Sequence, residues 1–136
     1  MKEGLVMKRY ISLLLFLIVL MVSSAAFAAY KPDPADWQWV DSNDTTSVYV
    51  RNSSIVRRYD GSIDAEICYV TPNEGQYSIH VVRFLPSGKS TYVFRIDLYN
   101  DTTHKLIKKY SGIIMSLMPV LPNTFAESGY KYVKTH

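Results

Sequence analysis

SIDAEICYVTPNEGQYSIHVVRFL, residues 62–85, decides the fold because it holds two alternating apolar segments with a turn between them. Side chains alternate between the two faces of a strand, so one face of the first segment is expected to reach the core: Ile63, Ala65, Ile67 and Tyr69. The other face receives Asp64, Glu66 and Cys68. The second segment, residues 76–85, alternates through Tyr77, Ile79 and Val81. With Pro, Asn and Gly between the segments, the stretch predicts an antiparallel hairpin.

Shorter segments of the same kind flank this hairpin on both sides. Further strands are predicted at residues 37–41, 47–51, 55–58, 91–99 and 104–110. Asp60-Gly61 and Pro86-Ser87-Gly88 supply turn residues between neighbouring strands, because Gly tolerates a positive φ angle. In residues 91–99, four side chains are expected to share one face: Tyr92, Phe94, Ile96 and Leu98. Strands joined by short turns predict an antiparallel β-meander of about six strands.

The tetrapeptide NDTT occurs twice, at residues 43–46 and 100–103, and each copy lies where one predicted strand must reverse into the next. Asn and Asp side chains bond their own backbone, and Thr starts a strand well. Both copies are therefore predicted to be turns. Asn43, Asn52 and Asn100 also begin N-glycosylation sequons, which matter only in a cell that has the transferase. A calcium loop needs more carboxylates than the one Asp of each copy.

The C-terminal segment changes from a strand period to a helical period. Thr124 is predicted to be the N-cap of a helix, and Glu127, three residues later, is expected to reach back to it as in a capping box. One helical face then carries Phe125, Gly129, Tyr132 and Val133, so a short amphipathic helix should pack on the sheet. The predicted fold class is α+β, an antiparallel sheet with a C-terminal α-helix.

The N-terminus has the three parts of a signal peptide: basic residues, an apolar run at residues 11–22 and the small-residue site Ala26-Phe27-Ala28. Residues 1–28 are predicted to be a cleavable signal peptide, residues 29–36 an extended lead-in, and residues 37–136 a single domain. The alternative is an uncleaved anchor, because the apolar stretch is nearly long enough to span a bilayer. No cysteine follows the run, so a lipoprotein anchor has no acceptor thiol. We expect a periplasmic, cell-surface or secreted protein without stable membrane insertion after cleavage.

The charge of the chain limits the partners that we expect, and its cysteine content limits how the fold can be stabilised. The formal charge of the chain is +3, and Lys2, Glu3, Lys8 and Arg9 together contribute +2 of it, which leaves +1 after the signal segment. A nearly neutral domain makes nucleic acid an unexpected partner. Cys68 is the single cysteine, so no internal disulfide can form and stability must come from a packed core.

Residues that could carry catalysis are sparse. Cys68 with His80 is the one nucleophile and base pair that neighbouring strands could bring together, and alternation is expected to place both opposite Ile67 and Ile79. Asp64 and Glu66 share a strand face, which suits acid–base chemistry and also an ordinary solvated sheet face. We predict no catalytic site and a protein that is not an enzyme.

The spacing of the candidate ligand residues supports neither a metal site nor an anion site. The three histidines, His80, His104 and His136, lack the intervals that bring two ligands onto one metal. No Gly-rich phosphate loop is present in the sequence, and we predict no metal or cofactor. The basic pairs at residues 57–58 and 108–109 are predicted to be solvated or edge-protecting charge rather than a heparin site.

Tyrosine is the unusual feature of the composition, with 11 residues in the chain. Tyr suits strands, and it also suits contact surfaces because it combines a large rigid ring with a polar tip. Four tyrosines are expected to lie outside the core-facing sets and form the candidate binding face: Tyr49, Tyr59, Tyr99 and Tyr130. An exposed cluster of them would indicate a surface for protein or sugar.

The segments WQWVDSNDTTSVYVRNSSIVR, residues 37–57, and MPVLPNTFAESGYKYV, residues 118–133, resemble the surface-adhesin protein E family of small exported bacterial domains. The tyrosine-rich residues 92–112 between them are compatible with it. The resemblance implies an antiparallel sheet with a C-terminal helix and attachment to host matrix proteins. The chain departs from the family in having Ala65-Glu66-Ile67 where a Trp is expected and Val133-Lys134-Thr135 where a cysteine is expected.

These patterns favour an exported, non-enzymatic binding module that contacts protein or glycan through an aromatic sheet face or an exposed edge strand. In the resembled family this role is that of an adhesin. The alternative is a structural or assembly component of the cell envelope, acting as a homodimer through paired edges or sheet faces. An enzyme would require Cys68 and His80 within hydrogen-bond reach.

Overall fold

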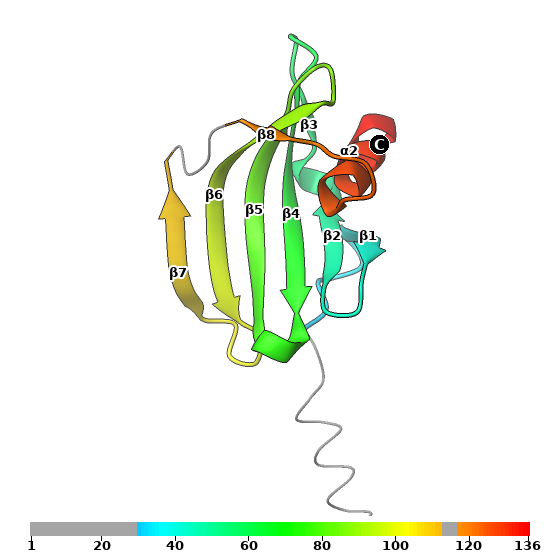
Figure 1. Ribbon diagram of the computed structural model, residues 1–136. Coiled ribbons are helices and arrows are strands. Elements are labelled where there is room, and N and C mark those ends of the chain that lie inside the picture. Colours follow the sequence, from blue (N-terminus) through cyan, green and yellow to red (C-terminus); the bar gives the residue numbers. More distant parts are fainter. Residues whose placement is uncertain (1–29, 113–116) are drawn as a thin grey trace, which may run out of the picture.

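The computed structural model describes residues 30–112 and 117–136 (Figure 1). The predicted signal peptide, residues 1–28, lies outside the described residues. The described chain forms a sheet and one α-helix, with two short 3-10 turns between strands. The elements are β1 (Trp37–Ser42), β2 (Ser47–Arg51), η1 (Asn52–Ser54), β3 (Val56–Arg57), β4 (Ile63–Thr71), η2 (Pro72–Glu74), β5 (Gln76–Phe84), β6 (Ser90–Asn100), β7 (Leu106–Ser111), β8 (Met118–Pro119) and α2 (Phe125–Thr135).

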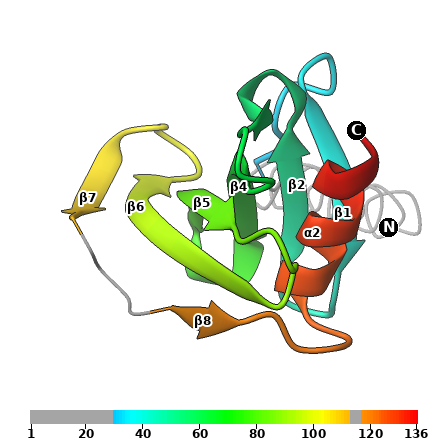
Figure 2. The ribbon, with the colours of Figure 1, turned by 90° about the horizontal axis from the view of Figure 1, so that it is seen from above.

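The strands form one antiparallel sheet in the order β1-β2-β4-β5-β6-β7, with β3 paired to β4 and β8 paired to β6. Consecutive long strands are neighbours, as in a meander. Figure 2 shows α2 and β8 on one side of the sheet, which we call the inner face; the other side is the outer face. The predicted α+β class, an antiparallel sheet with a C-terminal helix, is confirmed. Among the described residues, no helix has the length and apolar character needed to cross a membrane.

The inner face carries the main core. Its buried side chains come from four strands and α2: Val48, Val50, Ile63, Ala65, Ile67, Val82, Phe84, Val93 and Val133. The predicted core-facing set of β4 is among them or, for Tyr69, packs against them. Gly129 lets α2 approach closely, because a Cβ atom there would lie 3.2 Å from Ile67 Cδ1. Burial of these apolar groups contributes roughly 1.5–3 kcal/mol for each large side chain.

The outer face is also packed at the end of the sheet that the N-terminal residues reach. Cys68, Val70 and Tyr77 are buried there, with Cys68 only 1% exposed. Tyr30 stacks on Tyr77 with 3.8 Å between ring centroids, and Pro32 is buried. Residues 30–36 therefore contact the sheet, where the sequence had predicted an extended lead-in.

The register between β4 and β5 corrects the predicted faces of the two strands. Ile67 pairs with His80, and Cys68 pairs with Ile79. Residues directly opposite each other on neighbouring strands project from the same face. Ile67 and His80 are therefore inner, while Cys68 and Ile79 are outer. The expectation that Cys68 and His80 share a face was wrong.

A bulge in β6 corrects a second predicted face. Val82 pairs with Val93 and Val81 pairs with Arg95, so Phe94 is an extra residue in the ladder. An extra residue reverses the alternation after it. Ile96 consequently lies on the inner face with Val93, whereas Phe94 is 37% exposed and lies beside the Arg83 guanidinium, 4.9 Å from its ring centroid. The four side chains expected on one face of β6 do not share it.

Both NDTT copies form the same kind of turn, as predicted. Asn43 Oδ1 accepts hydrogen bonds from the backbone N–H groups of Thr45 and Thr46, at 2.9 and 2.8 Å. Asn100 Oδ1 accepts the equivalent pair from Thr102 and Thr103, both at 2.9 Å. In each copy, the side chain of the first Asn replaces a backbone acceptor and closes the turn.

The C-terminal helix begins as predicted, with one difference in its cap. Thr124 Oγ1 accepts a hydrogen bond from Glu127 N at 3.3 Å, so Thr124 is the N-cap. The Glu127 carboxylate accepts from Asn123 N, at 3.3 Å, rather than from Thr124 N. Ser128 Oγ donates to Asp41 Oδ2 at 2.7 Å and links the helix to β1.

Candidate ligand-binding sites

The four predicted tyrosines do not form one face. Tyr59 is fully exposed at the hairpin after β3, at 101%. Tyr130 lies on α2 and packs against Phe84 on the inner side, with 5.5 Å between ring centroids. Tyr49 and Tyr99 both pack on the outer face, partly buried. Two of the four therefore share a surface.

An aromatic stack covers the outer face over β5 and β6. Tyr77 lies between Tyr30, at 3.8 Å, and Tyr99, at 5.0 Å, and all three rings are nearly parallel. His104 approaches Tyr30 edge-on at 5.2 Å. Burial, followed by the neighbouring Tyr30 hydroxyl, raises the pKa of Tyr77 to about 12. Because these rings pack against one another, this part of the outer face is a closed layer and not an open binding site.

A hollow of about 300 Å³ lies beside this stack, at the β1 edge. The hollow, called here the tryptophan hollow, is lined by Lys31, Pro32, Pro34, Trp37, Gln38, Trp39 and Tyr49. Trp37 and Trp39 share a face of β1 because they are two residues apart, and Trp39 pairs with Tyr49. The Trp39 side chain is 51% exposed. Three aromatic rings thus border one opening, and Lys31 brings an ammonium group to its lining.

Ionic contacts surround Trp37, one of the rings that line the tryptophan hollow. The Arg51 guanidinium lies 5.8 Å from the Trp37 ring centroid. Its Nε donates to Asp36 at 2.8 Å and its Nη1 donates to Glu66 at 2.9 Å. Hydrogen bonds from Ser53 and then Arg51 lower the pKa of Asp36 to about 2. The carboxylate stays charged, so the contact that orients Arg51 and Trp37 persists through the neutral range.

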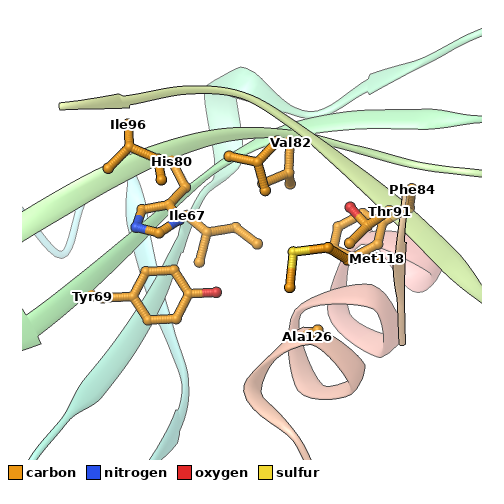
Figure 3. Close-up of a pocket in the computed structure, with 10 residues that line it drawn as sticks. Ile67, Tyr69, His80, Val82, Phe84, Thr91, Ile96, Met118 and Ala126 are labelled. Carbon is orange, nitrogen blue, oxygen red and sulfur yellow. The ribbon is translucent and has the colours of Figure 1, made fainter. Parts of the chain in front are cut away.

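A second cavity, of about 180 Å³, lies on the inner face between the sheet, β8 and the first turn of α2 (Figure 3). We call it the inner pocket. Its apolar walls are Ile67, Val82, Phe84, Val93, Ile96 and Met118. Its other lining residues are Tyr69, His80, Thr91 and Ala126. Met118 is 40% exposed and marks where the pocket meets solvent.

The polar groups of the inner pocket are neutral. His80 Nε2 and Ser78 Oγ are 3.0 Å apart, and burial lowers the pKa of His80 to about 4. Burial raises the pKa of Tyr69 to about 12, and its ring lies 4.5 Å from that of His80. Thr91 Oγ1 already donates to the Arg83 carbonyl at 2.9 Å.

The candidate catalytic residues do not assemble. Cys68 and His80 lie on opposite faces of the sheet. Burial raises the pKa of the Cys68 thiol to about 12, which keeps it protonated and unreactive. The Asp64 and Glu66 carboxylates are held in ion pairs, with Arg83 Nε at 2.6 Å and Arg51 Nη1 at 2.9 Å, respectively. In residues 30–112 and 117–136, no group of three His, Cys, Asp or Glu could hold a metal ion.

Of the four tyrosines predicted from the sequence, Tyr49 lines the tryptophan hollow. The inner pocket was not predicted. Trp37 and Trp39 were predicted as part of a strand, at residues 37–41. Packing of Pro32 and Pro34 against them depends on where residues 30–36 lie, for which the sequence carries no local signal. Tyr69 and His80 could have been paired only by knowing the register of β4 and β5.

No family model matches the chain, and neither a curated protein nor a solved structure was found to match it.

Proposed function

We propose that the protein is an exported, non-enzymatic binding module that holds a glycan in the tryptophan hollow. The observation that carries the proposal is the grouping of Trp37, Trp39 and Tyr49 around one opening, with Trp39 half exposed. Large rigid rings with polar groups beside them are typical of contact surfaces. The volume of about 300 Å³ is at the lower end of the range for ligand sites, roughly 300–1,000 Å³.

A sugar ring fits the chemistry of the hollow better than an extended peptide does. Sugars present an apolar C–H face to an aromatic ring and hydroxyl groups at their edge. Lys31, which lines the hollow, supplies an ammonium group that can donate hydrogen bonds to the hydroxyls.

The test is solid-phase binding to immobilised matrix glycoproteins and envelope glycans, before and after enzymatic removal of the glycans. We expect saturable binding that disappears with the glycans and falls at least about tenfold in Trp39→Ala, as for a contact residue at the centre of an interface. Tyr59→Ala is the matched control, because Tyr59 is fully exposed and is not among the residues that line the hollow. Binding that survives deglycosylation, or that Trp39→Ala leaves unchanged, would contradict the proposal.

A second candidate function, assembly as a homodimer in the envelope, is favoured by β7. All six of its residues are exposed, including Leu106, Ile107 and Tyr110. An uncovered edge strand can pair with another chain. Lys108 and Lys109 oppose self-pairing, because an antiparallel pair centred on them places like charges opposite each other. Light scattering over a range of protein concentrations tests this candidate. A wild-type mass that doubles as the concentration rises, together with an Ile107→Lys variant that stays monomeric, would support the dimer.

A further inference from the structure

The inner pocket differs from the tryptophan hollow in position and in chemistry. It lies on the opposite face of the sheet, and its walls are almost entirely aliphatic and aromatic. The volume of about 180 Å³ is slightly above the ~150 Å³ of an engineered apolar cavity that binds benzene. The pocket therefore has room for one six-membered ring with a small substituent.

One polar atom is directed into this space. In Figure 3 the Tyr69 ring lies beside His80, and its hydroxyl points toward the region bounded by Ile67, Met118 and Ala126. The other two polar side chains of the lining are engaged, His80 with Ser78 and Thr91 with the Arg83 carbonyl. Within the described ranges, the Tyr69 hydroxyl has no hydrogen-bond partner in the protein.

We infer that the inner pocket is a binding site for a small neutral aromatic molecule that carries one hydrogen-bonding oxygen, which meets the Tyr69 hydroxyl while the ring fills the space beneath Met118. The apolar walls favour the ring by removing it from water. A hydroxyl group on the ligand provides both an acceptor and a donor for the Tyr69 hydroxyl.

A charged ligand does not suit the same pocket. No Lys or Arg lines it, and His80 is held neutral by burial, since its pKa is about 4. A carboxylate placed beside Tyr69 would lose its hydration without gaining an opposite charge. The site is therefore expected to discriminate 4-methylphenol from 4-methylbenzoate, although the two molecules have the same ring and the same methyl group.

The test uses protein produced from the full-length chain, with methyl NMR signals of Met118 and Ala126 as reporters. Toluene, 4-methylphenol and 4-methylbenzoate are the probes. We expect saturable shifts with 4-methylphenol, weaker binding of toluene and no saturation with 4-methylbenzoate. Tyr69→Phe should weaken 4-methylphenol about 3- to 10-fold, the size of one hydrogen bond, and leave toluene unchanged. Tyr92→Phe, a substitution outside the lining, is the control.

A filling substitution tests the location of the site. Ala126→Leu places a larger side chain in the pocket at a helix position that favours Leu, so it should abolish binding of both neutral probes while the protein stays folded by circular dichroism. If that variant does not fold, the ratio of 4-methylphenol to toluene affinity in Tyr69→Phe still tests whether the ligand oxygen meets the Tyr69 hydroxyl. The inference is overturned if neither neutral probe saturates, if 4-methylbenzoate binds as well as 4-methylphenol, or if Tyr69→Phe weakens both neutral probes equally. These outcomes are independent of glycan binding on the outer face.

Discussion

The two faces of this sheet are covered in different ways. The inner face is covered by α2, which the sequence places at the C-terminus, and its core consists of interlocking aliphatic side chains around Phe84. The outer face is covered at one end by Tyr30 and the prolines after it, and its packing consists of stacked aromatic rings. Beyond those rings the outer face stays open at Trp39, which is 51% exposed.

This difference separates stability from recognition. Apart from the inner pocket, the interdigitated aliphatic side chains of the inner face leave no opening for a ligand, and their removal would create cavities. A ring that packs through one face can leave its other face in solvent, so the exposed ring of Trp39 is available for contact with a ligand. We therefore attribute most of the free energy of unfolding to the inner face and glycan contact to the outer face.

The largest expected effect is on the inner face. Phe84 is 1% exposed and lies against α2, so Phe84→Ala should lower the free energy of unfolding by about 3–5 kcal/mol. Trp39→Ala on the outer face should lower it by less than about 1 kcal/mol, because half of the ring is already in water. Urea unfolding of both variants measures the two values. Similar losses of unfolding free energy in the two variants would contradict the assignment of most of the stability to the inner face.

The next largest effect is a dependence of stability on pH that arises from His80 on the inner face. Burial holds the pKa of His80 at about 4 in the folded protein, below its ordinary 6.5, so the folded state favours the neutral ring. Stability from this group is complete above pH 6.5 and is lost as the pH falls toward about 4, by at most about 3 kcal/mol. Unfolding measured between pH 7 and 4 should show the loss in the wild type. It should be much smaller in His80→Gln, and an unchanged profile in that variant would exclude His80 as the cause.

A smaller effect is expected for the cover of the outer face. Tyr30→Ala removes the ring that stacks on Tyr77 at 3.8 Å and should cost about 1–2 kcal/mol, from the ring pair and from part of its buried area. Cys68, the single cysteine, is a built-in probe because it is buried beneath this layer. Labelling of Cys68 by a maleimide should be faster in Tyr30→Ala than in Tyr59→Ala. Equal labelling rates would mean that residues 30–36 do not protect the face.

Local signals in the sequence predicted the strands and turns of both faces. Asp60-Gly61 turns with Gly61 at φ 89°, the two NDTT copies close through Asn43 and Asn100, and Thr124 caps the helix. Each of these depends on a few consecutive residues, and backbone preferences decide them with little help from the rest of the fold. The class of the fold follows from their order.

Features that depend on the fit between strands could not be predicted in the same way. The connection between Thr71 and Gln76 sets a register in which odd-numbered residues of β4 oppose even-numbered residues of β5. A shift of one residue would have placed Cys68 and His80 on the same face. The bulge at Phe94 and the packing of Tyr30 on Tyr77 likewise depend on distant partners. Of the residues around the tryptophan hollow, Tyr49 had been named as a candidate, whereas Trp37 and Trp39 had not, and the inner pocket was not predicted.

The smallest effect is expected from the exposed ion pair under the tryptophan hollow, and its pH range separates the two faces. Hydrogen bonds from Ser53 and Arg51 lower the pKa of Asp36 from 3.8 to about 2. The stability that this carboxylate provides is complete above pH 3.8 and is lost as the pH falls toward about 2, below the range in which His80 acts. Asp36→Asn should remove that low-pH component and leave the loss between pH 6.5 and 4 intact. It should also weaken glycan binding at neutral pH, because Asp36 positions Arg51 against Trp37, whereas Asp60→Asn, at an exposed turn away from the hollow, should not. Glycan affinity unaltered by Asp36→Asn would mean that the rings of the hollow hold their positions without the ion pair.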